Sequence, residues 1–136
     1  MGARSNSTYA AGKTFTDREG VFHPSAQTVN TITTAINRTL TADESGSTVF
    51  VTAADKVMTL PATQAGLTYT FVLGNGGLSS GTGLSISPAA ADAIDSNGDD
   101  TDFVNSGATD TVGDSVTVVG DGAGGWYAMN VQGTWT

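Results

Sequence analysis

The sequence contains no cysteine, only three prolines and only five basic residues among its 136 positions. Without cysteine there can be no disulfide framework, no thiolate zinc site and no cysteine nucleophile. No stretch reaches the roughly 20 consecutive apolar residues that a membrane-spanning helix needs, and the first residues lack the apolar segment of a signal peptide. We therefore expect a soluble protein with no membrane partner.

Positive charge is scarce and unevenly placed. All five lysines and arginines lie in the first 56 positions, and the eight acidic residues that follow have no basic counterpart. The net charge of −8 would repel a polyphosphate, so nucleic acid is not an expected partner. An acidic surface of this kind favours a partner that presents lysine or arginine.

Glycine and threonine are abundant instead, with 18 and 22 copies, and they supply turns and β-branched strand positions. A chain of this length forms one small domain. From Arg38 to the end, short β-rich runs alternate with turn signals, a pattern typical of a sandwich or barrel. We therefore predict an all-β fold, a small antiparallel β-sandwich or barrel-like domain at residues 38–136, preceded by an extended N-terminal arm at residues 1–37. No repeat at a fixed period is apparent, so a solenoid is not expected.

Alternation of apolar and polar residues predicts the individual strands. The clearest run, residues 67–73, directs its leucines, Tyr69 and Phe71 to one face. Residues 47–53 and 56–60 are expected to pair with each other across a turn at Ala54-Asp55. Residues 84–87 are expected to form a further strand.

The C-terminal third predicts a hairpin after a long polar stretch. Residues 115–119 and 126–131 flank a glycine-rich turn and are expected to pair as the closing hairpin. Alternation then sends Tyr127 and Trp126 to opposite faces, so at least one of these aromatic side chains lies in the core or an interface. The stretch 88–113 predicts either one long excursion or two very short strands.

Residues 25–40 allow two interpretations. Val29, Ile32, Ile36 and Leu40 recur at helical spacing after a possible N-cap at Ser25, which predicts a short helix. The many threonines argue equally for a strand, because β-branched residues fit extended backbone. We favour the helix.

The polar arm contains three spaced aromatic residues, Tyr9, Phe15 and Phe22. Aromatic side chains in such a segment gain stability only if they are buried, either on the parent domain or on a neighbouring molecule. We expect them to act as anchors.

Motifs that carry chemistry are incomplete. Residues 77–81 match G-x-S-x-G, but no helix follows and the one histidine, His23, lies in the arm. Asp95, Asn97 and Asp99 occupy the first, third and fifth positions of a calcium loop, yet the sixth position is not glycine and the twelfth is not glutamate. We therefore expect no enzyme activity, no catalytic residue, no metal and no cofactor.

Four segments together resemble small structural proteins of tailed bacteriophages, above all capsid decoration (cement) proteins. They are LTADESG at 40–46, LPAT at 60–63 with the run to Phe71, ATDTVGD at 108–114, and GGWY at 124–127 with GTW at 133–135. The resemblance implies a β-rich, often trimeric protein on the exterior of the capsid, where it bridges major capsid protein subunits.

From the residues and the resemblance together we expect a structural virion protein. Its partners are expected to be the major capsid protein and two further copies of itself in a homotrimer. The residues expected at the capsid or subunit interface are Tyr9, Phe15, Phe22, Ile32, Ile36 and Trp135. The alternative is a phage fibre module that binds host-surface glycans through the loop at 74–83 or through exposed aromatic residues.

Overall fold

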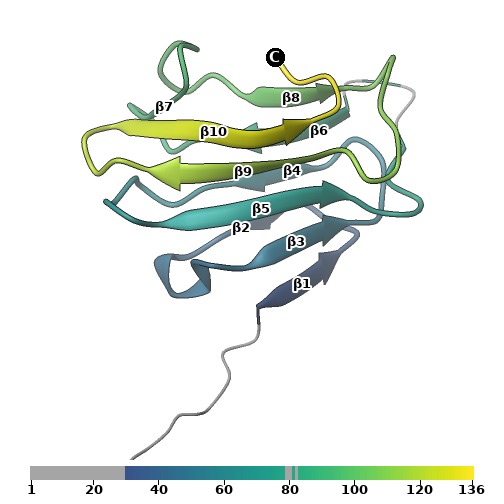
Figure 1. Ribbon diagram of the computed structural model, residues 1–136, viewed down its shortest axis with the longest axis horizontal. Coiled ribbons are helices and arrows are strands. Elements are labelled where there is room, and N and C mark those ends of the chain that lie inside the picture. The colour runs from purple at the N-terminus through teal and green to yellow at the C-terminus, as the bar shows by residue number, and fades with distance from the viewer. Residues whose placement is uncertain (1–29, 79–80, 82) are drawn as a thin grey trace, which may run out of the picture.

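The computed structural model describes residues 30–78, 81 and 83–136, which form two mixed β-sheets packed face to face (Figure 1). The six-stranded sheet has the order β1-β3-β5-β9-β10-β7 and the four-stranded sheet the order β2-β4-β6-β8. A β-rich fold is confirmed. In chain order the elements are β1 (Thr31–Thr34), β2 (Arg38–Thr39), η1 (Ala42–Glu44), β3 (Thr48–Val51), β4 (Val57–Thr59), β5 (Thr68–Leu73), β6 (Gly83–Ser87), β7 (Ala93–Ile94), β8 (Phe103–Ser106), β9 (Ser115–Gly120) and β10 (Gly125–Gln132).

The first six strands wind as a two-sheet coil. They alternate between the layers, so that β1, β3 and β5 lie side by side in one sheet and β2, β4 and β6 in the other, and each pair is parallel. Thr31 pairs with Thr48, 17 positions later, whereas Thr48 pairs with Thr70, 22 positions later. The turns of the coil differ in length, which is why no fixed period is visible in the sequence. The expectation of no solenoid is therefore wrong for this half.

The second half of the chain adds three antiparallel pairs and one parallel pair, which joins β7 to β10. β9 pairs with β5 and with β10, and β8 pairs with β6. After β10 the chain crosses to the other layer, where residues 134–136 bond to Val104 and Ser106 of β8. The predicted closing hairpin and the strand at residues 84–87 are confirmed. The stretch 88–113 contains the two short strands β7 and β8, the second of its two expected forms.

Two expectations about the first half are wrong. β3 and β4 do not pair but lie in different sheets, because residues 52–56 carry the chain from one layer to the other. The described part of the expected helix, residues 30–40, forms β1 and β2 instead. Its helical spacing does not mark a buried face, since Ile36 is 70% exposed while Leu40 is buried. Strand structure therefore begins before residue 38. Within the described residues, no helix has the length and hydropathy of a membrane span.

The core lies between the sheets and is built from rows of inward side chains. Ile32, Val49, Phe71 and Val116 occupy matching positions on four adjacent strands, and all but Ile32 are fully buried. The opposite layer contributes a comparable row, which is Arg38, Met58, Ile86 and Phe103. In each row the last residue, which lies on β1 or β2, is only partly buried, whereas the other residues are buried.

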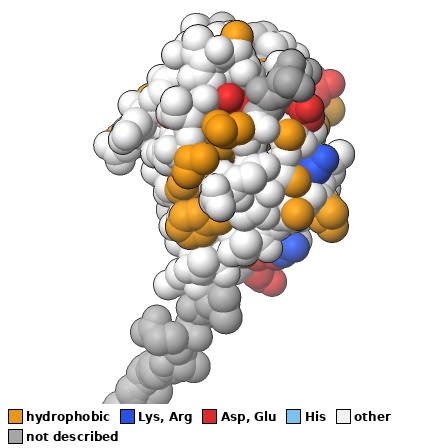
Figure 2. Space-filling model, turned by 90° about the vertical axis from the view of Figure 1, so that its right-hand side faces the viewer, with side chains coloured by type: hydrophobic (Ala, Val, Ile, Leu, Met, Phe, Trp, Pro, Cys, Tyr) orange, Lys and Arg blue, Asp and Glu red, His pale blue; other side chains and the backbone are white. Residues whose placement is uncertain are grey.

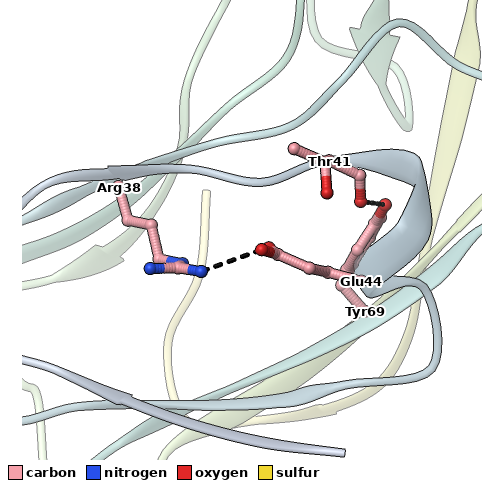
Figure 3. A network of polar contacts seen from close by, with 4 residues as sticks. All are labelled: Arg38, Thr41, Glu44 and Tyr69. Carbon is pink, nitrogen blue, oxygen red and sulfur yellow. Dashed lines mark hydrogen bonds and ion pairs between the residues drawn. The ribbon is translucent and has the colours of Figure 1, made fainter. Parts of the chain in front are cut away.

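A polar network joins the first connection of the coil to the core (Figure 3). The buried Tyr69 donates its hydroxyl hydrogen to the carbonyl oxygen of Thr41 at 2.7 Å. Arg38 donates to Glu44 at 2.8 Å in an ion pair whose side chains are 37% and 27% exposed. Burial, and then the charge of Glu44, raise the pKa of Tyr69. The network fixes η1 against the core at the β1 and β2 end of the coil.

Candidate interaction surface

The outer face of the six-stranded sheet presents a row of threonines. The register aligns Thr31, Thr48, Thr70 and Thr117 on four adjacent strands, and Met129 of β10 ends the row. The hydroxyl oxygens of Thr70 and Thr117 lie 2.8 Å apart and share a hydrogen bond. Since neighbouring strands lie about 4.8 Å apart, the side chains of the row are regularly spaced across the sheet.

Apolar side chains flank this row on its exposed edge. Tyr127, Met129 and Val131 of β10 are 55%, 51% and 48% exposed. Thr68, Val119 and Tyr127 form a neighbouring row. Among the described residues, every outward side chain of β1, β3, β5, β9 and β10 is uncharged; besides those just named, they include Thr33, Phe50, Val72 and Ser115.

Charge lies elsewhere on the molecule. Figure 2 views the molecule from the side of Figure 1 at which β5 ends, and hydrophobic side chains form a band down one edge of this view. Most of the acidic and basic side chains in the view lie toward the opposite edge. An uncharged sheet face on a chain of net charge −8 is therefore the surface on which another protein can dock with the least desolvation of charge.

Of the residues expected at an interface, the three that the structure describes, Ile32, Ile36 and Trp135, lie apart from one another. Tyr9, Phe15 and Phe22 lie outside the described residues. Ile32 is half-buried against the core, and Ile36 is exposed in the corner between β1 and β2. Trp135 is half-buried, stacks on Phe103 at 5.7 Å between ring centroids, and donates its indole N–H to Gln132.

Part of this surface was predictable from the sequence. Tyr127 and Trp126 were predicted on opposite faces, and Trp126 is fully buried and packs on Tyr69 at 5.9 Å between ring centroids, while Tyr127 is exposed. The threonine row was not predicted. The signal was present as Thr-x-Thr in β1 and β5, but the row exists only once the strand register is known.

Two acidic residues of the described part of the chain, Asp92 and Asp114, are buried, and Asp114 lies at the centre of a hydrogen-bond network. Asp114 is only 4% exposed, and its carboxylate accepts from the hydroxyl of Thr111 at 2.7 Å, the amide of Thr111 at 3.0 Å and the side chain of Asn105 at 3.1 Å. Burial acts to raise the pKa of Asp114, but these donors outweigh it and leave the pKa below its ordinary value. The same Asn105 side chain donates to the carbonyl of Thr134. The network therefore ties the C-terminal crossing to β8 and to the start of β9.

Four of the sequence stretches that carry the phage resemblance lie against one another in two pairs. Thr63 of LPAT donates its hydroxyl hydrogen to the carbonyl of Gly125 in GGWY at 2.9 Å. Gly133 of GTW has a φ of 96°, and an added Cβ there would collide with the carboxylate of Asp114 in ATDTVGD. These motifs fix the ends of β10, so they describe the fold rather than a reactive site.

Among the described residues, the acidic loop at 95–102 does not form a cluster of metal-binding side chains. Within the described residues, no three acidic or histidine side chains are placed to hold a metal. Asp95 instead accepts the backbone N–H of Ala128 at 2.8 Å and adopts a φ of 53°. Its carboxylate therefore supports the edge of β10.

Comparison with protein-family models, with curated proteins and with solved structures yields no match.

Proposed function

We propose that this protein is a non-enzymatic capsid decoration protein of a tailed bacteriophage, which binds the exterior of the head and bridges major capsid protein subunits. The phage assignment rests on the resemblance of the four sequence segments. The docking face rests on one observation: β10 exposes Tyr127, Met129 and Val131 beside an uncharged threonine row.

A surface of this kind suits adhesion. Apart from Met129, its side chains are short, β-branched or aromatic and stand on paired strands, so ordering them on binding costs less conformational entropy than ordering long flexible side chains. Burial of a large apolar side chain contributes about 1.5–3 kcal/mol. A repeated lattice of such contacts adds avidity without any new chemistry.

A homotrimer fits the same surface. Copies that each carry a charge of −8 repel one another, and contact through an uncharged face avoids placing acidic side chains against each other. We propose that part of this face joins the copies and that the remainder meets the capsid.

The test is a single charge placed on the face. Met129→Lys should lower the affinity for phage heads that lack this protein by about tenfold or more, because a lysine would be desolvated there. Val112→Lys is the matched control, since Val112 lies in a loop and is 51% exposed, as Met129 is. Cryo-electron microscopy and quantitative gel analysis of the heads would measure occupancy.

Equal occupancy of the heads by both variants would overturn the docking face, and no binding of the unaltered protein to any head would overturn the decoration role. The exposed ring of Tyr127 supports the alternative, a fibre module that stacks on host glycans. That reading requires the isolated protein to bind cells or polysaccharide, and Tyr127→Ala to abolish the binding.

A further inference from the structure

The sulfur atoms of this chain belong to methionine side chains alone. The sequence has three methionines and no cysteine, so thioethers are its most readily oxidised groups. Two of the three lie in the described residues and differ sharply in environment: Met58 of β4 is fully buried between the sheets, whereas Met129 of β10 points outward and is 51% exposed. An oxidant in solution therefore reaches the sulfur of Met129 and not that of Met58.

The pairing of β10 explains why Met129 is accessible. On one side its neighbour is the short side chain of Thr117 on β9, and the ladder becomes irregular directly after this pair, where Asn130 takes a φ of 52°. On the other side β7 pairs only with the first two residues of β10, so in the described part of the chain no strand lies beside Met129 there. Neither flank of β10 covers the thioether.

A peroxide is the class of oxidant that suits this site. The sulfur lone pair attacks one oxygen of the peroxide, and an S–O bond forms as the O–O bond breaks. The proton of the attacked oxygen passes to the leaving oxygen, which departs as water or an alcohol. Sulfur is thus oxidised by two electrons and the peroxide is reduced, so the product is methionine sulfoxide and no further co-reactant is needed.

The sulfoxide changes the surface on which it forms. A flexible apolar side chain becomes a polar one with a strong hydrogen-bond acceptor, and its burial in an uncharged interface requires that this oxygen lose its water. Thr117, beside it in the row, is already engaged in a hydrogen bond with Thr70 at 2.8 Å. Oxidation of Met129 therefore opposes the apolar burial through which the face docks.

We propose that Met129 is an oxidation site, that peroxides convert it selectively to the sulfoxide, and that the sulfoxide weakens docking. The selectivity follows from burial alone, whereas the loss of docking rests on the proposed function. Met129 then lies in the part of the face that meets the capsid, because a thioether covered by another copy would not be reached. Oxidants act on the protein before it binds, and binding protects the site.

Peptide mass spectrometry tests the selectivity. In the full chain treated with dilute hydrogen peroxide, Met129 should be oxidised at a rate about tenfold or more above that of Met58, because Met58 is reached only when the core opens. The control is the same treatment in concentrated urea, where both side chains should react at similar rates. Equal rates in the folded protein would overturn the site. A slow Met129 would also overturn it, by showing that this part of the face is covered in solution.

Met129→Leu tests the effect on docking, since leucine is apolar, has a similar volume and does not react with peroxide. The native protein and the variant are treated with peroxide, catalase removes the excess, and each is mixed with untreated heads that lack the protein. Oxidation should lower the affinity of the native protein about tenfold and leave that of the variant unchanged. Methionine sulfoxide reductases with a dithiol reductant should restore the native affinity.

The outcomes separate this inference from the function on which it rests. An equal loss of binding by both proteins would assign the damage to other residues, and unchanged binding with Met129 fully oxidised would show that the sulfoxide is tolerated. Either result overturns the effect on docking and leaves the docking face in place. Absence of binding by the untreated protein would instead overturn the decoration role, and the peptide measurement would still decide whether Met129 is the oxidation site.

Oxidation of assembled heads provides a further measurement. Met129 of protein already bound to heads should react about tenfold or more slowly than Met129 of the free protein, because the contact excludes water and peroxide from the sulfur. Met58 is the internal reference and should react slowly in both states. An unchanged rate at Met129 would contradict its place in the part of the face that meets the capsid.

Discussion

At the scale of single residues, Asp114 joins the turn at Thr111 to β8 through its carboxylate, and its partner Asn105 extends the network to Thr134. Asp114→Asn removes a charge that accepts three hydrogen bonds and places an amide N–H₂ group against donors. Because hydrogen bonds to charged groups are stronger than neutral ones, we expect the free energy of unfolding to fall by about 1.5–3 kcal/mol. Urea denaturation followed by tryptophan fluorescence would measure it. Asp99→Asn, at an exposed position, should change the value by less than about 0.5 kcal/mol.

The same residue predicts an acid-sensitive component of stability. The pKa of Asp114 is lower in the folded protein than in the unfolded chain, so the unfolded chain binds the proton first as the pH falls. The stabilisation is fully present above about pH 4 and is lost as the pH drops through the folded-state value. Denaturation of both proteins from pH 7 to pH 2 should show the difference between the native protein and Asp114→Asn shrinking with acid. A difference that stays constant would contradict this assignment.

At the scale of elements, the two faces of the six-stranded sheet have different energetic roles. Phe71 on β5 is fully buried, whereas Phe50 on the adjacent β3 points outward and is half-buried. Phe71→Ala should lower the free energy of unfolding by about 3–5 kcal/mol, because it leaves a cavity between the sheets. Phe50→Ala, the same chemical change on the outer face, should cost about 1 kcal/mol or less. Comparable losses in denaturant titrations would show that the outer face is covered in solution.

The elements also show which features the sequence could predict. Alternation within β5 and within the β9–β10 hairpin predicted the strands and placed Trp126 and Tyr127 on opposite faces, because these features depend on contacts close in sequence. The pairing of β3 with β5 and of β4 with β6 joins residues about 20 or more positions apart through turns of unequal length. No local pattern encodes that register, so β3 and β4 were wrongly paired.

The candidate surface, too, was predictable only where it depends on residues of a single strand. That Tyr127 and Trp126 lie on opposite faces was predictable from period two within one strand. The threonine row was not, since it combines Thr31, Thr48, Thr70 and Thr117 from strands whose order is set by the coil. Ile36, one of the residues expected at an interface, is exposed in a corner of the coil and does not belong to the uncharged face.

At the scale of the whole molecule, charge and adhesion are segregated. The chain carries a net charge of −8, yet the described outward positions of five strands carry no charge at all. Two attachment modes therefore make opposite predictions. Docking through the acidic surface depends on attraction to lysines and arginines of the partner, and docking through the uncharged face depends on apolar burial.

Ionic strength separates these modes. At 0.5 M salt the screening length falls to about 4 Å, so attraction between an acidic surface and a basic partner is largely lost, while repulsion between neighbouring acidic copies is also reduced. Docking through the uncharged face should therefore keep or increase head occupancy between 0.05 and 0.5 M sodium chloride, at roughly constant protein concentration. Sedimentation of heads incubated with the protein at each salt concentration would measure the bound fraction. A steep loss of binding with salt would assign the contact to the acidic surface and contradict the docking face proposed on β10.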